Sequence, residues 1–176
     1  MVSRPRPDGD LPDSVRSGSR PHRVSDAQPA GTDAPQAAGA YSVARRIGGL
    51  VHTAGMTPRR GGALVATGMI GGDISIESGR ELTTLATERA LEAAASILLP
   101  TESLAGVVSL TVFLAAIPSF TEHSAVADAA SALVSERMPG APLPVRAAVG
   151  VASLPGGAPV EVQLIAEVEL AEQLPG

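Results

Sequence analysis

Two charged residues near the C-terminal end have types and positions suited to chemistry on a small molecule. Arg146 lies in a run of Val, Ala and Gly that is typical of a strand, directly after a Pro-rich loop. A guanidinium group can hold a carboxylate through two parallel charge-assisted hydrogen bonds. Arg146 is therefore a candidate carboxylate-binding residue; a surface or interface ion pair is the alternative interpretation.

The second candidate, Glu161, alternates with apolar residues in the run 160–164. The alternation predicts that Glu161 and Gln163 share one face of a strand and that Val160 and Val162 share the other. A carboxylate in such a position can act as a general base toward water. An ordinary solvated strand carboxylate is the alternative.

The composition excludes several kinds of site. The chain has no cysteine, which excludes a disulfide, a thiolate nucleophile and a Cys-ligated metal. His22, His52 and His123 lack metal-ligand spacing, so a metal site is not expected. The net charge of -5 argues against a nucleic-acid surface. The doublets 45–46 and 59–60, both Arg-Arg, are interpreted as solvated loop charges.

No segment of the sequence predicts a membrane protein. The longest apolar run, residues 106–117, is shorter than a membrane span and contains Ser109 and Thr111. The N-terminus lacks the apolar stretch of a secretory signal, so a cytoplasmic location is expected. All thirteen basic residues are Arg, which together with abundant Ala, Gly and Pro indicates a GC-rich bacterial genome.

The sequence divides into an extension, a domain and a short tail. Residues 1–38 are rich in Pro, Arg and Asp without apolar periodicity, and they are predicted to be disordered. A tether for a partner or a misassigned start codon would also explain them. Residues 39–171 have the pattern of a single domain, and residues 172–176 form a C-terminal tail.

The hydrophobic pattern of the domain predicts the element order β-β-α-β-α-β-β. Ser75 or Ser78 is the expected N-cap of the first helix, and Pro100 is expected to stop it. Two helices are too few to cover both faces of the sheet, so both are expected on one face, with other copies of the chain on the second face. The expected strands are 50–54, 63–67, 107–114, 145–152 and 160–168, and the second helix is 121–137.

Four segments, taken in order, resemble the RidA/YjgF family. The last two are the most specific, because Arg146, the pair Leu154-Pro155 and Glu161 keep the family's spacing. Two short motifs, 72–75 and 119–122, are more similar to a divergent YjgF-like branch. The four segments are Gly39–Ala44 with Gly48–Gly55, Val107–Leu114 leading to Phe120, Pro144–Pro155, and Ala158–Ala166.

The resemblance implies an α+β, chorismate-mutase-like fold, with a mixed sheet, two helices packed on one face, and a homotrimer whose clefts lie between subunits. It implies hydrolysis of 2-imino and 2-enamino acids to 2-oxo acids and ammonia without a cofactor. In that reaction Arg146 would grip the substrate carboxylate and Glu161 would orient the attacking water. Tyr41 matches a tyrosine that closes over the substrate, although it could equally be a packing residue.

The candidate site departs from the family at several positions. Ala54 replaces a serine, and Met56 replaces the glutamine that usually follows the hairpin glycine. Ser124 corresponds to a common asparagine, and Ala148 replaces a cysteine but still offers a backbone N–H to a substrate. The pocket is therefore expected to have fewer polar contacts. His123 is expected to be exposed, with a polar role in the pocket as the alternative.

These residues support three functions of different kinds. The first is a deaminase of reactive imines or enamines. The second is a non-catalytic module that binds a small carboxylate, and the third is an enzyme acting on an enamine intermediate of specialised metabolism. Ribonuclease activity, attributed to some relatives, fits poorly with the net charge of -5 and the 2% aromatic content.

Overall fold

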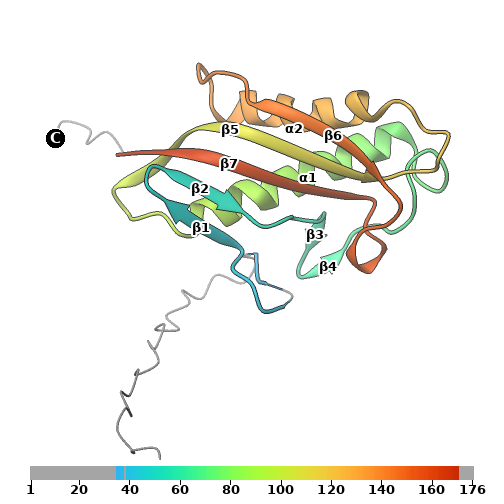
Figure 1. The fold of residues 1–176 in the computed structure, drawn as a ribbon, viewed down its shortest axis with the longest axis horizontal. Helices are drawn as coiled ribbons and strands as arrows, with labels where there is room; N and C mark the ends of the chain where they lie inside the picture. Colours follow the sequence, from blue (N-terminus) through green and yellow to red (C-terminus); the bar gives the residue numbers. More distant parts are fainter. Residues whose placement is uncertain (1–34, 38, 171–176) are drawn as a thin grey trace, which may run out of the picture. The chain divides into compact units, whose positions relative to one another are not determined.

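The computed structural model describes residues 35–37 and 39–170. Most of the expected N-terminal extension and the whole of the expected tail 172–176 lie outside these residues. The described residues form a five-stranded sheet and a separate two-stranded hairpin (Figure 1). In sheet order the strands are β1 (Ala44–Ile47), β2 (Leu50–Thr53), β7 (Val160–Leu170), β5 (Glu102–Ala115) and β6 (Val145–Val151).

The sheet is mixed, as expected. β5 and β6 run parallel, because α2 (His123–Arg137) connects them as a crossover, and the other neighbouring pairs are antiparallel. The C-terminal strand β7 lies in the interior of the sheet, between β2 and β5. Residues far apart in the sequence therefore meet along β7.

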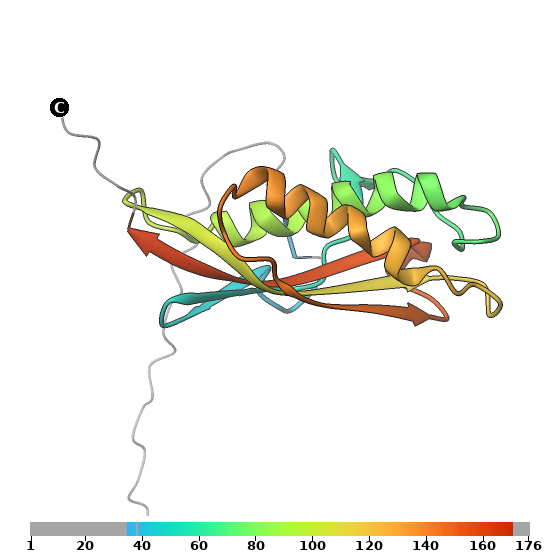
Figure 2. The same ribbon diagram turned by 90° about the horizontal axis from the view of Figure 1, so that it is seen from above.

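Both helices, α1 (Ile76–Ala95) and α2, pack on the same face of the sheet, and Figure 2 shows the opposite face without a covering layer. This confirms the expected α+β architecture. Ser75 is the N-cap of α1, since its Oγ accepts a hydrogen bond from the backbone N–H of Ser78 at 3.2 Å.

Two helix ends differ from the expected positions. α1 ends at Ala95 rather than continuing to Pro100, because Leu98 N–H bonds to Ala95 O in a tighter three-residue turn. α2 begins at His123, two residues later than expected, while Phe120 N–H still bonds to the Ile117 carbonyl in the preceding turn.

The core lies between the helices and one face of the sheet. β5 and β7 bury alternate residues on this face, and Val112, Val160 and Val162 are fully buried. The facing side of α1 contributes small residues, including Ala86 and Ala90, which are also fully buried. Small helix residues let the helix backbone approach the sheet closely, so an aliphatic core with few aromatics can be well filled.

The N-terminal strands differ from the expected ones. Residues 63–67 were expected as a strand, but only Ala63–Leu64 (β4) pairs, with Arg59–Arg60 (β3). Gly61 and Gly62 connect them with φ of 56° and 79°, the positive values that a two-residue hairpin turn requires. β1 was not among the expected strands because this edge strand contains Arg45 and Arg46 and lacks apolar alternation.

The face of the sheet opposite the helices is partly apolar. Phe113 and Ile165 are half-buried there, and Val149 on the neighbouring strand is exposed. No helix within the described ranges is long and apolar enough to cross a membrane. The half-exposed apolar side chains make this face suitable for contact with another protein surface.

Candidate functional site

A cavity of about 460 Å³ lies at the edge of the sheet, next to the start of β1 and the end of β2. Beyond β2 the chain stays beside β7, because Met56 and Val162 exchange two backbone hydrogen bonds of 2.8 and 2.9 Å. Tyr41, Gly55 and Glu161 line this cavity. The structure therefore brings together two of the residues that the sequence singled out, Tyr41 and Glu161.

Glu161 is half-buried, and its carboxylate lies directly over Gly55. A Cβ atom built on Gly55 would lie 2.0 Å from Glu161 Oε1, so only glycine leaves room for the carboxylate. Burial raises the pKa of the Glu161 carboxyl above its usual value. Because Val160 and Val162 are fully buried on the helix side, the expected alternation along β7 is confirmed.

Tyr41 comes from the segment that precedes β1. Its side chain is 53% exposed and its ring lines the cavity, so it is not a core packing residue. The backbone N–H of Tyr41 bonds to Gly39 O at 2.9 Å, which turns the chain just before the ring. Such an exposed ring at a cavity rim can cover a bound molecule.

Arg146 does not line this cavity. Its Nη2 lies 2.9 Å from Asp128 Oδ1, and its Nη1 donates to Ser131 Oγ at 2.9 Å. Asp128 and Ser131 both belong to α2, and the Arg146 side chain is 20% exposed. A guanidinium has five N–H donors, so donors remain for a ligand. Asp128 was not among the residues expected at the site, although it lies four residues after Ser124 and hence on the same side of the helix.

The other residues expected near Arg146 lie on the same side of the sheet. Ala148 is two residues further along β6 and packs against the core, and Ser124 is exposed in the first turn of α2. His123 is half-buried rather than exposed, with its ring edge-on to Phe120 at 5.2 Å. It fits there because Gly150 has no side chain; a Cβ on Gly150 would lie 2.4 Å from His123 Nε2.

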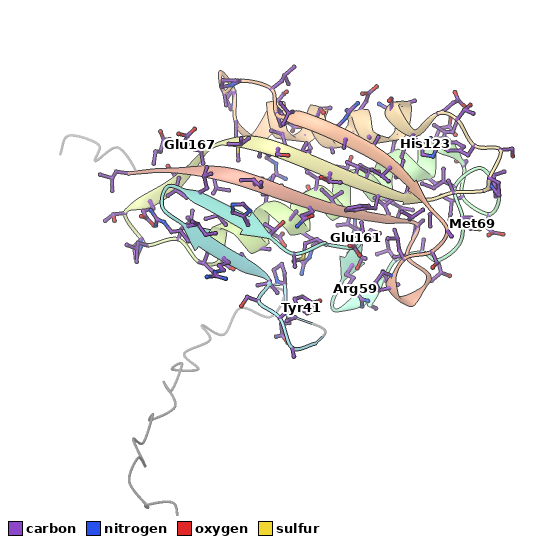
Figure 3. All side chains as sticks on the ribbon, viewed as in Figure 1. Tyr41, Arg59, Met69, His123, Glu161 and Glu167 are labelled. Carbon is purple, nitrogen blue, oxygen red and sulfur yellow. The ribbon has the colours of Figure 1, made fainter. Side chains whose placement is uncertain are left out.

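Arg146 and Glu161 are on opposite faces of the sheet. In the register of the sheet, Arg146 on β6 is paired with Leu110 on β5, and Leu110 is paired with Leu164 on β7. Leu164 is buried on the helix side, and Glu161, an odd number of residues away, points to the other face. Two strand spacings and three residues along the strand separate the Cα atoms of Arg146 and Glu161 by about 14 Å. One subunit therefore holds two separate groups of candidate residues. In Figure 3, Glu161, Arg59 and Tyr41 lie in the lower part of the view. His123 lies in the upper part, beside α2 and β6.

Two arginines that the sequence did not single out also line the cavity, Arg59 and Arg89. The prediction that the 59–60 doublet is a solvated loop was wrong for Arg59, which lies in β3 and is half-buried. Since successive side chains of a strand point to opposite sides, Arg60 lines a different cavity, beside α1. A two-residue strand at Arg59–Arg60, followed by a turn at Gly61 and Gly62, would have indicated that the two arginines point to opposite sides of the hairpin.

The cavity side chains do not form an obvious metal site. Within the described ranges, no group of three His, Asp or Glu residues is arranged to hold a metal ion. The titratable groups that the described residues bring to this cavity are a carboxyl, a phenol and two guanidinium groups.

Comparison with known proteins shows one family. Residues 31–168 match the model of the family described as Endoribonuclease L-PSP. The Trypanosoma cruzi protein TCP17 is 33% identical over 119 residues, which cover 67% of this chain and 74% of TCP17.

Two solved structures show the same fold. Atu1372 of Agrobacterium tumefaciens, a protein of unknown function, is 31% identical with a TM-score of 0.69, covering 76% of this chain and 86% of Atu1372. The YjgF product of E. coli is 21% identical with a TM-score of 0.58, covering 78% and 95% respectively. The chain is thus more similar to Atu1372 than to E. coli YjgF by both measures.

Proposed function

The chain belongs to the Endoribonuclease L-PSP family, which is the RidA/YjgF family, and on this premise we propose that it hydrolyses reactive 2-imino or 2-enamino acids to 2-oxo acids and ammonia. The observation that carries this proposal is Glu161, a half-buried carboxyl with a raised pKa that faces a cavity of suitable size beside Tyr41.

In the proposed reaction, Glu161 acts on water. The ionised carboxylate accepts a proton from a water molecule whose oxygen attacks C2 of the protonated imine. The same carboxyl returns the proton to the nitrogen of the resulting carbinolamine. As the C–N bond breaks and ammonia leaves, the regenerated carboxylate accepts the hydroxyl proton, which leaves the carbonyl of a 2-oxo acid, and the carboxyl then passes this proton to ammonia or solvent. A carboxyl with a raised pKa is a stronger base when ionised and a usable acid when protonated, which suits both steps.

Arg146 is proposed to bind the substrate carboxylate through the N–H groups that Asp128 and Ser131 do not engage. Ala148, on the same face of β6, would contribute its backbone N–H, and Ser124 would contribute its hydroxyl from α2. Tyr41 would cover the substrate from the cavity rim. No step in this scheme needs a cofactor.

A homotrimer is part of the same proposal. Arg146 and Glu161 are about 14 Å apart on opposite faces of one sheet, so a single small substrate cannot contact both in one subunit. A second copy can place its Arg146 edge against the Glu161 cavity, and the uncovered apolar face containing Phe113 provides a contact surface. The clefts would then lie between subunits.

The test uses the full-length protein and imines generated in situ by an amino-acid oxidase, with semicarbazide added to trap imine that escapes hydrolysis. The protein is expected to lower semicarbazone formation in proportion to its concentration, and Arg146→Ala is expected to abolish this effect. Folded, trimeric protein that leaves semicarbazone formation unchanged would refute the deaminase. Carboxylate binding lost in Arg146→Ala but without turnover would identify a binding module instead.

A further inference from the structure

Arg59 is held rigidly at the wall of the cavity. Its Nε donates to Thr57 Oγ1 at 3.1 Å, and its Nη1 donates to Gly62 O at 2.6 Å. Nη2 extends toward Gly156, where a Cβ would lie 4.0 Å from it, and it has no hydrogen-bond partner within residues 35–37 and 39–170. The guanidinium is therefore oriented by the hairpin, while its third nitrogen remains available.

Among the described residues, the cavity lining has more positive than negative side chains. Arg59 and Arg89 line it, and within residues 35–37 and 39–170 the carboxyl of Glu161 is the single one that does so. Arg89 is buried and forms a 2.8 Å ion pair with Glu92, and Glu92 does not line the cavity. Burial, rather than a nearby guanidinium, is the cause of the raised pKa of Glu161.

We propose that Arg59 binds a second anionic group of the ligand, so that this cavity favours dicarboxylic 2-imino acids over monocarboxylic ones. The reacting carbon would lie near Glu161, and the side-chain carboxylate would accept a hydrogen bond from Arg59 Nη2, with Arg89 adding to the positive potential. The assignment of these ligands as substrates rests on the proposed function. The preference for a second carboxylate is a binding property and does not depend on turnover.

Binding is measured by titration calorimetry on the full-length protein with two ligands of equal chain length, 2-oxoglutarate and 2-oxovalerate, which differ only in the terminal carboxylate. We expect the wild type to bind 2-oxoglutarate about tenfold or more tightly than 2-oxovalerate. Arg59→Gln should remove this difference. Arg60→Gln is the matched control, because it removes the same charge from the adjacent residue outside this cavity, and it should keep the preference.

Equal binding of the two ligands by the wild type, an unchanged preference in Arg59→Gln, or binding of neither ligand would overturn the proposal. Arg59→Lys is the substitute variant if Arg59→Gln proves unstable. It keeps the charge but not the fork of donors, so it should retain part of the preference for 2-oxoglutarate.

A turnover experiment separates this proposal from the proposed function. Imines made from glutamate are compared with imines made from norvaline, which have the same chain length, each by a suitable oxidase. Hydrolysis of both at equal rates, with no binding preference, would support the deaminase and refute the role of Arg59. A binding preference that Arg59→Gln abolishes, without any hydrolysis, would support Arg59 and refute the deaminase.

Discussion

The Glu161 region and the Arg146 region of the subunit differ in how their charges are satisfied. Glu161 faces a cavity, has a raised pKa, and forms no ion pair within the described part of the chain. Arg146 is ion-paired with Asp128, hydrogen-bonded to Ser131, and lines neither described cavity. The difference suggests a division of tasks, in which one region keeps a reactive group without a partner and the other holds a binding group in a fixed orientation.

Of the changes to these two regions, loss of the Glu161 carboxylate should have the largest effect on imine hydrolysis. Glu161→Gln keeps the size of the side chain but cannot accept a proton, so we expect kcat for imine hydrolysis to fall by about a hundredfold or more. Steady-state rates in the semicarbazide assay measure this. Glu167→Gln is the matched control, since Glu167 is exposed on the same face of β7 and lies outside the cavity. Similar rates for Glu161→Gln and wild type would show that Glu161 is not the base.

Displacement of the same carboxylate should have a smaller but clear effect. Gly55→Ala introduces a Cβ where Glu161 Oε1 now lies, so the carboxylate must move and we expect kcat to fall about tenfold or more. Gly49→Ala is the control, because nothing lies within 4 Å of a Cβ at Gly49 and its φ is not positive. Circular dichroism should show that both variants are folded. Full activity of Gly55→Ala would show that the position of Glu161 is not critical.

At the Arg146 region the expected change is a gain in affinity. Asp128→Asn keeps an oxygen acceptor for Arg146 but removes a negative charge that repels an incoming carboxylate. Because the Asp128 side chain is 59% exposed, the effect should be modest, with KM lowered roughly two- to fivefold and kcat unchanged. Glu136→Gln removes the same charge from an exposed position of α2 and should leave KM unchanged. A higher KM in Asp128→Asn would mean that the full ion pair is needed to position Arg146.

The smallest effect concerns stability. Because burial raises the pKa of Glu161 above its usual value of 4.5, the folded chain binds this proton more tightly than the unfolded chain does. The free energy of unfolding should therefore decrease as the pH rises from the unfolded pKa through the folded one. Glu161→Gln should be more stable than wild type near pH 7 and equal to it near pH 4, as measured by urea unfolding. A difference that does not change with pH would contradict this origin.

Patterns with a strong period allowed much of the fold to be predicted. Alternation along β7 separated Val160 and Val162 from Glu161, and of the two expected N-caps of α1, Ser75 and Ser78, the first is the observed one. The element boundaries at Ala95 and His123 were less accurate, because tight turns next to helices leave no periodic signal. β1 was missed because an edge strand with solvated side chains need not alternate.

The sequence allowed single candidate residues of the site to be named. It did not allow prediction of the contacts between side chains from different elements. Glu161 and Tyr41, which the sequence singled out separately, line one cavity, whereas Arg146 does not line it. Asp128 could not be identified, because its pairing with Arg146 depends on how α2 lies over β6. Arg59 was missed because its place in a two-residue strand determines on which side of the hairpin it lies.

The position of β7 in the sheet has a consequence for biosynthesis. The hairpin of β1 and β2 is synthesised early, but its partner within the sheet is the last of the described strands to leave the ribosome. Until β7 has emerged, the hairpin and β5 cannot pair with it, and Glu161 cannot take its place over Gly55. The long sequence separation of these contacts predicts slow completion of the sheet and a nascent chain with unpaired edges of β2 and β5. The cavity should therefore be among the last features of this domain to form.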